Sequence, residues 1–184
     1  LEIPPVEDKA ALAPVIMKYA LDTSGKPLSE KLSPAGKRKY TKELAELGAP
    51  ANAFDKFKPF FATLTLVMAN AQKLGMTGEN GAEAVLAKAA KDGKKPISAL
   101  ETIDYQMGLF ANMSDAEQVK MLEETLDELP KAGAMFKEMN AHWSRGDAEG
   151  MAKLMNEMDA QSPAFYKALL ASGVPYVLLR NGWY

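Results

Sequence analysis

Two carboxylates, Glu2 and Glu101, lie at positions in the sequence that could support acid–base or metal chemistry. Glu2 lies in a short strand-like triplet, and Glu101 follows the apolar run from Pro96 to Leu100. If these runs are neighbouring strands of a parallel sheet, both acids lie at the edge of the sheet where α/β sites form. Two acids there can hold a hard cation or transfer protons. The structural alternative is that Glu101 caps the helix that begins after Thr102, and for Glu2 we favour a structural role.

The single histidine of the chain, His142, limits the other chemistries. One histidine cannot form a two-histidine zinc site, and there is no cysteine to complete one. Catalysis by a Ser-His-Asp triad would need His142 as its base, but no nucleophile-elbow sequence accompanies it. A Gly-rich phosphate-binding loop is also absent from the sequence. We therefore expect a structural or surface role for His142 on a predicted helix.

The composition is that of an ordinary globular protein. The chain has 184 residues, of which 47% are hydrophobic and 25% charged, enough for one domain with a core. Its net charge of −2 excludes the broad basic field of a nucleic-acid-binding protein. No run approaches the roughly 18 apolar residues of a transmembrane helix, so we predict no transmembrane segment. The chain begins with Leu1 rather than methionine, which we interpret as a processed product or a fragment.

The elements that must position these residues are mainly helices. Apolar side chains recur at helical spacing along most of the chain. Ser33-Pro34 is a helix start, with a hydroxyl cap and a proline in the first turn. The segment from Phe60 to Leu74 is apolar nearly all round, which predicts a central helix that is buried on most sides. Lining a ligand groove is the alternative role for this helix.

The middle of the chain carries the best strand candidate. The stretch from Gly81 to Lys91 predicts a small Ala-rich helix that packs through Val85 and Leu86. The apolar run from Pro96 to Leu100 follows a turn and predicts a short buried strand. Thr102 is expected to cap the next helix.

The second half of the chain predicts further helices. Ser114 to Glu117 forms a capping box that starts one of them. Another runs from Ala132 to Arg145 with Trp143 facing inward, and Asp147 caps the helix after it. Ser162-Pro163 is the start of a last helix.

These patterns predict a single helical domain over residues 1–184. Its fold class is mainly α, a multi-helix domain with one or two short β-strands. Missing sheet strands would leave edges and apolar faces exposed. We therefore expect self-association into a homo-oligomer.

The order of several motifs resembles the TraB/GumN family. The stretch from Lys95 through Leu100-Glu101-Thr102 to Gln106 is similar to the family signature GKP-hydrophobic-x-x-LET-x-x-x-Q. Trp143-Ser144-Arg145-Gly146-Asp147 is similar to its W-x-x-G-D element. Arg180-Asn181 and Trp183 resemble its R-N…W element, and the similarity runs over nearly the whole chain.

The resemblance implies an α/β protein with a large helical insertion, often exported, with metal-dependent proteases among its relatives. On this resemblance, the chain is the helical part of a larger α/β fold. It implies that Glu2 matches the family acid, and that Glu101 and Arg180 complete a catalytic group. Further family-like polar positions are Gln106, Trp143, Asp147 and Asn181. A periplasmic or secreted location follows from the same resemblance.

The two G-x-x-H motifs to which the family activity is tied are absent from this sequence. His142 follows Met139-Asn140-Ala141, so it does not replace either motif. We therefore expect no tight binding of the family's divalent metal and no catalysis by this chain. On this interpretation, the chain is the helical middle of a metal-dependent hydrolase that acts on peptides or proteins. The alternative is a non-enzymatic helical module that binds a peptide or an apolar ligand in a Met- and Phe-lined groove.

Overall fold

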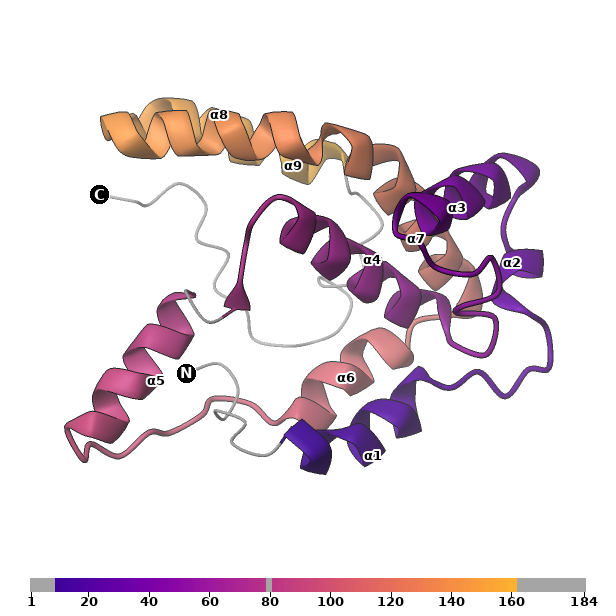
Figure 1. Ribbon diagram of the computed structural model, residues 1–184, viewed down its shortest axis with the longest axis horizontal. Helices are drawn as coiled ribbons and strands as arrows, with labels where there is room; N and C mark the ends of the chain where they lie inside the picture. Colours follow the sequence, from indigo (N-terminus) through magenta and orange to yellow (C-terminus); the bar gives the residue numbers. More distant parts are fainter. Residues whose placement is uncertain (1–8, 79–80, 162–184) are drawn as a thin grey trace.

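The structure is a computed structural model that describes residues 9–78 and 81–161, with side chains for residues 12–78 and 81–157. These residues are mainly helical, which confirms the predicted fold class (Figure 1). The elements are α1 (Lys9–Ala20), α2 (Leu28–Lys31), α3 (Pro34–Glu46), α4 (Pro59–Lys73), α5 (Ala82–Asp92), α6 (Ile103–Ala111), α7 (Asp115–Glu128), the 3₁₀ turn η2 (Leu129–Lys131), α8 (Ala132–Arg145) and α9 (Ala148–Gln161).

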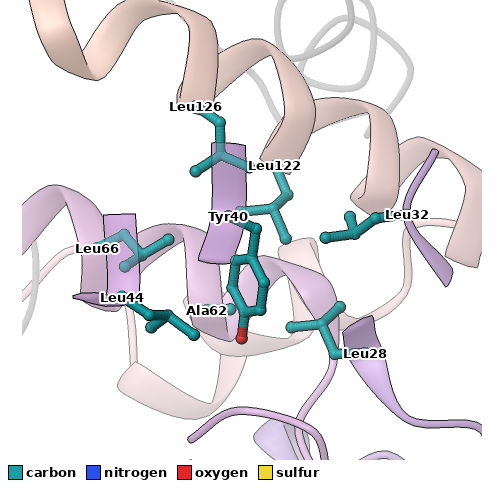
Figure 2. Close-up of a cluster of buried hydrophobic side chains, with 8 residues drawn as sticks. All are labelled: Leu28, Leu32, Tyr40, Leu44, Ala62, Leu66, Leu122 and Leu126. Atoms are coloured by element: carbon teal, nitrogen blue, oxygen red, sulfur yellow. The ribbon is translucent and has the colours of Figure 1, made fainter. Parts of the chain in front are cut away.

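The core lies where α2, α3, α4 and α7 meet. Tyr40 and Leu44 come from α3, Leu66 comes from α4, and Leu122 comes from α7; all four are fully buried (Figure 2). Because these side chains recur every three or four residues along their helices, each helix presents one apolar stripe to the others. The complete cluster is Leu28, Leu32, Tyr40, Leu44, Ala62, Leu66, Leu122 and Leu126.

A second cluster joins α6 to the same core. Phe60 of α4 is fully buried and packs with Ala111 and Met121, from α6 and α7. Its ring is stacked on that of Phe110, with the ring centroids 6.2 Å apart. This contact places the C-terminal end of α6 against the first turn of α4.

The helix starts follow their predicted caps. Ser33 Oγ accepts a hydrogen bond from the Gly36 amide, and Ser114 and Glu117 form the reciprocal capping box. The carboxylate of Glu123 on α7 accepts a hydrogen bond of 2.7 Å from the Ser33 amide. An acid at the positive end of α3 is electrostatically favourable, and it also fixes α7 against α3.

The strand predicted for Pro96–Leu100 is wrong. The segment is exposed and non-helical, Leu100 is 87% exposed, and the chain runs as a long connection from α5 to α6 (Figure 1). A strand needs a neighbouring chain to pair with. Within residues 9–78 and 81–161 the β-pairing is one isolated bridge, between Leu21 and Phe57.

Three packing predictions are also corrected. One face of α4 is not buried, because Val67 and Met68 on that face are exposed. Val85 and Leu86 do not pack, and α5 contains no buried residue. Trp143 is 72% exposed rather than inward-facing. In each case no helix within residues 9–78 and 81–161 covers the apolar side chain.

The helices α8 and α9 form an antiparallel pair along one side of the molecule (Figure 1). Gly146 turns the chain between them with a φ of 65°, a left-handed conformation that glycine adopts at little cost. No helix in the described part of the chain is both long and apolar enough to cross a bilayer.

Candidate functional site

The predicted catalytic group is only partly within the structure. Glu2, Arg180 and Asn181 lie outside the described residues, so their proximity to Glu101 stays a prediction. Glu101, together with Gln106, Trp143 and Asp147, is described. These four residues fall in two separate places, the start of α6 and the α8–α9 turn.

At the start of α6, Glu101 is half-buried and precedes the cap of the helix. The cap itself is Thr102, whose hydroxyl accepts a hydrogen bond of 3.1 Å from the Tyr105 amide. The capping role considered for Glu101 therefore belongs to Thr102. Gln106 is half-buried one turn further on, and its backbone N–H donates a hydrogen bond to the Thr102 carbonyl.

Asp104, which the sequence reasoning did not single out, is the best-connected acid in this region. It accepts hydrogen bonds of 2.8 Å from the Tyr19 hydroxyl and 3.0 Å from Lys18 Nζ. The bond from Tyr19, followed by that from Lys18, holds the pKa of Asp104 below its ordinary value. Because Lys18 and Tyr19 belong to α1, the cluster ties α1 to the first turn of α6. Its sequence signal was an acid in the first turn after a threonine cap.

The W-x-x-G-D stretch forms the turn between α8 and α9. Asp147 Oδ1 accepts a hydrogen bond of 2.8 Å from the Gly150 amide and so caps α9, as predicted. Its Oδ2 lies 2.7 Å from Nδ1 of His142, and its own amide donates to the His142 carbonyl. A Cβ added to Gly150 would overlap the imidazole ring, so a larger residue here would displace the His142 side chain.

The electrostatics of this turn fit a structural role. The Gly150 amide, followed by His142, lowers the pKa of Asp147, so the carboxylate stays ionised and keeps both contacts. His142 Nε2 lies 3.8 Å from the Glu138 carboxylate, and Arg145 lies 3.8 Å from Asp147. The imidazole therefore links the end of α8 to the start of α9, in line with the structural role expected for His142.

A buried ion-pair cluster at Lys31 escaped the sequence reasoning. Lys31 Nζ lies 2.5 Å from Asp22 Oδ2 and 2.7 Å from Asp115 Oδ1, and its side chain is only 5% exposed. The signal was its position: Lys31 follows Leu28 by three residues and so shares the buried face of α2. The two acids bring the loop after α1 and the start of α7 to one lysine.

Gln118 is a second buried polar group that the sequence reasoning missed. It is almost fully buried, and its Oε1 accepts a hydrogen bond of 3.4 Å from the Phe60 amide. Its Nε2 donates a hydrogen bond of 2.8 Å to the Met113 carbonyl. The side chain thus satisfies a backbone donor at the start of α4 and an acceptor in the α6–α7 loop. This is a structural task rather than a catalytic one.

The described side chains do not assemble a metal centre. Among residues 12–78 and 81–157, no group of three or more His, Asp or Glu side chains is arranged to hold an ion. What the described residues can present to a ligand is an exposed apolar surface. Val67 and Met68 on the outer face of α4 are exposed, Met68 by 63%, and Leu74 and Met76, which follow in the chain, are exposed as well.

Comparison with known proteins agrees with the motifs. The model of the TraB/PrgY/gumN family matches residues 1–174. Searches of curated proteins and of solved structures gave no match. The matched range includes the four core helices α2, α3, α4 and α7, the LET stretch at Glu101 and the α8–α9 turn. On this match, the chain belongs to the TraB/PrgY/gumN family.

Proposed function

We propose that this chain forms the helical, substrate-bordering part of a TraB/GumN-type metal-dependent hydrolase that acts on peptides or proteins. The observation that carries the proposal is the two-sided character of α4. One face of this helix is fixed in the core through Ala62 and Leu66, while Val67 and Met68 lie off that face and are exposed. A periplasmic or secreted location is part of the same proposal.

The outer face of α4 has the properties of a binding surface. Its backbone is held rigid because the opposite face packs on α7. Contiguous exposed apolar side chains commonly mark a site where a partner or ligand binds. Methionine is unbranched and polarizable, so Met68 and Met76 can adapt to different side chains of an unfolded substrate. A peptide lying along α4 would cover both.

The divalent metal of the proposed hydrolase does not fit the described side chains. His142 is the only histidine in the chain, and its Nδ1 is engaged by Asp147. Glu101 belongs to no group of three or more His, Asp or Glu side chains among the described residues that could hold an ion. We therefore assign substrate binding, rather than bond cleavage, to the described helices.

A non-enzymatic binding module is the second candidate. The same exposed face of α4 favours it, since an apolar surface can hold a peptide without any chemistry. The predicted Phe-lined groove needs revision for either function, because Phe60 is fully buried in the core. The methionine-bearing outer face of α4 takes its place.

Titration of Zn²⁺ and Mn²⁺ into the chain, followed by calorimetry and thermal unfolding, separates the two candidates. Stoichiometric, tight binding that raises the unfolding midpoint supports the hydrolase and contradicts the module. Absence of metal binding agrees with both candidates, because neither places a metal centre on the described side chains.

The role of α4 is tested with a fluorescently labelled, permanently unfolded polypeptide, reduced and carboxymethylated α-lactalbumin. The Val67→Ser, Met68→Ser double variant is expected to bind it about tenfold more weakly. The matched control is Val85→Ser, Leu86→Ser on α5, which removes similar exposed side chains and should leave the affinity unchanged. Equal losses in both variants would contradict the assignment to α4.

A further inference from the structure

The segment of residues 81–100, which we call the basic arm, differs from the rest of the chain in both packing and charge. It consists of α5 and the connection to α6, and it contains no buried residue. In Figure 1, α5 lies apart from the core helices α3 and α7. A segment that adds nothing to the core, yet carries aliphatic side chains, needs another explanation.

The charge of the basic arm is opposite to that of the remaining chain. It holds four of the 22 basic residues and two of the 24 acidic ones, so its own net charge is +2. The rest of the chain has 18 basic and 22 acidic residues, a net charge of −4. The four lysines fall within eight positions, at Lys88, Lys91, Lys94 and Lys95. Such an asymmetry points to an anionic partner.

The apolar side chains of the basic arm accompany these lysines. On α5, Val85 and Leu86 share one face with small alanines, and Lys88 and Lys91 lie on the other side of the helix. Leu86 is 62% exposed. After the helix, Lys94 and Lys95 are followed by the exposed side chains of Ile97 and Leu100. Each pair of lysines therefore stands beside a pair of exposed aliphatic side chains.

We propose that the basic arm docks on the surface of an anionic lipid bilayer. The lysines contact the phosphates of the headgroups, and Val85, Leu86 and Leu100 enter the boundary between headgroups and acyl chains. An amphipathic helix with lysines on its polar face lies in that plane without crossing the membrane. The inference uses α5 rather than α4, so it stands or falls independently of the proposed hydrolase.

The shape of the basic arm favours a bilayer over a folded acidic protein. Its aliphatic side chains are spread over a helix and a connection, and it contains no aromatic residue that could fill a pocket. Protein interfaces depend on such central anchors, whereas a bilayer adapts to a dispersed set. The basic face of α3 makes a contrast, since Lys37, Arg38 and Lys42 are exposed there without an exposed large aliphatic residue on that helix.

The test is co-sedimentation of the full chain with two kinds of vesicle at low salt. One is pure phosphatidylcholine, and the other contains about 30% phosphatidylglycerol, which gives it an anionic surface. Wild-type protein is expected to bind the anionic vesicles and not the neutral ones. Changing Lys88, Lys91, Lys94 and Lys95 together to Gln should weaken binding at least tenfold, since each lysine near an anionic surface contributes about a factor of five.

The matched control removes the same number of charges from α3, by changing Lys37, Arg38, Lys39 and Lys42 to Gln. It should weaken binding by less than about threefold, because only long-range attraction is lost. Leu86→Gln, Leu100→Gln should also weaken binding while leaving every charge in place. All variants should keep the wild-type unfolding midpoint, because none of the changed side chains is buried.

Three results would overturn the proposal. The first is no binding of the wild type to anionic vesicles. The second is an equal loss in the α3 control, which would show bulk charge attraction only. The third is tight binding of a soluble acidic peptide such as polyglutamate, with no vesicle binding, which would assign the basic arm to an acidic protein partner.

Discussion

The helices α4 and α5 follow one another in the chain, yet their aliphatic side chains have opposite environments. Leu66 of α4 is fully buried, whereas Leu86 of α5 is 62% exposed. α4 is the more apolar helix, but its own pattern does not decide burial, since Met68 of α4 is exposed as well. The partner decides it: α7 offers α4 an apolar stripe with Leu122 and Leu126, and no described helix offers α5 a comparable one. Burial is therefore a property of a pair of helices.

The sharpest test of this contrast is to shorten one leucine in each region. Leu122→Ala in α7 should lower the free energy of unfolding by about 2–5 kcal/mol, because it leaves a cavity in the core. Leu86→Ala in α5 should change it by less than about 0.5 kcal/mol. Urea unfolding followed by circular dichroism measures both. A large loss in Leu86→Ala would reveal that α5 has a packing partner after all.

A lysine in each region extends the contrast to charges. Lys31 forms ion pairs at 5% exposure, while Lys88 pairs with Asp92 at 80% exposure. Lys31→Met should cost about 3 kcal/mol, because Asp22 would remain as a buried charge with its partner removed. Lys88→Met should cost less than about 0.5 kcal/mol, since solvent screens an exposed pair. The same urea titrations measure both losses of unfolding free energy. Similar values for the two variants would contradict the burial of Lys31.

The same cluster predicts how stability depends on pH. Burial alone raises the pKa of Asp22, but the bonds from Lys31 and Ser24 outweigh it and leave the pKa below its ordinary value. The stabilisation is therefore complete above the unfolded pKa of about 3.9 and is lost as the pH falls through the folded value. Unfolding free energies of wild type should decline in this acid range. Asp22→Asn should decline less steeply, and parallel curves would show that Asp22 does not contribute.

Local signals in the sequence predicted the helices well, because caps and helical spacing act within a few residues. Ser33, Thr102 and Ser114 each cap the predicted helix. The predictions that failed, a strand and three packing contacts, each needed a distant partner. The Pro96–Leu100 run has strand-like composition, but composition cannot supply a neighbouring strand. The buried role of Lys31 depends on acids nine residues before it and 84 after it, which no local pattern reveals.

The contacts of the candidate site also fall into local ones, which the sequence predicts, and distant ones, which it does not. The cap formed by Asp147 was predictable from its place after a helix-ending glycine, since that signal is local. The His142–Asp147 contact requires the turn geometry set by Gly146, and Asp104 requires α1 to lie beside α6. The grouping of Glu2 with Glu101 and Arg180 remains a prediction about residues from distant parts of the chain.

The smallest expected effect belongs to Trp143, which lies in the last turn of α8 and is exposed. Trp143→Ala should lower the free energy of unfolding by less than about 0.5 kcal/mol, because the ring is exposed. Asp147→Ala, four residues away, should cost about 1 kcal/mol through loss of the α9 cap. In urea unfolding, Asp147→Ala should therefore lower the free energy of unfolding more than Trp143→Ala does. A loss of several kcal/mol in Trp143→Ala would mean that another surface covers the ring, so that the end of α8 belongs to the packed part of the molecule.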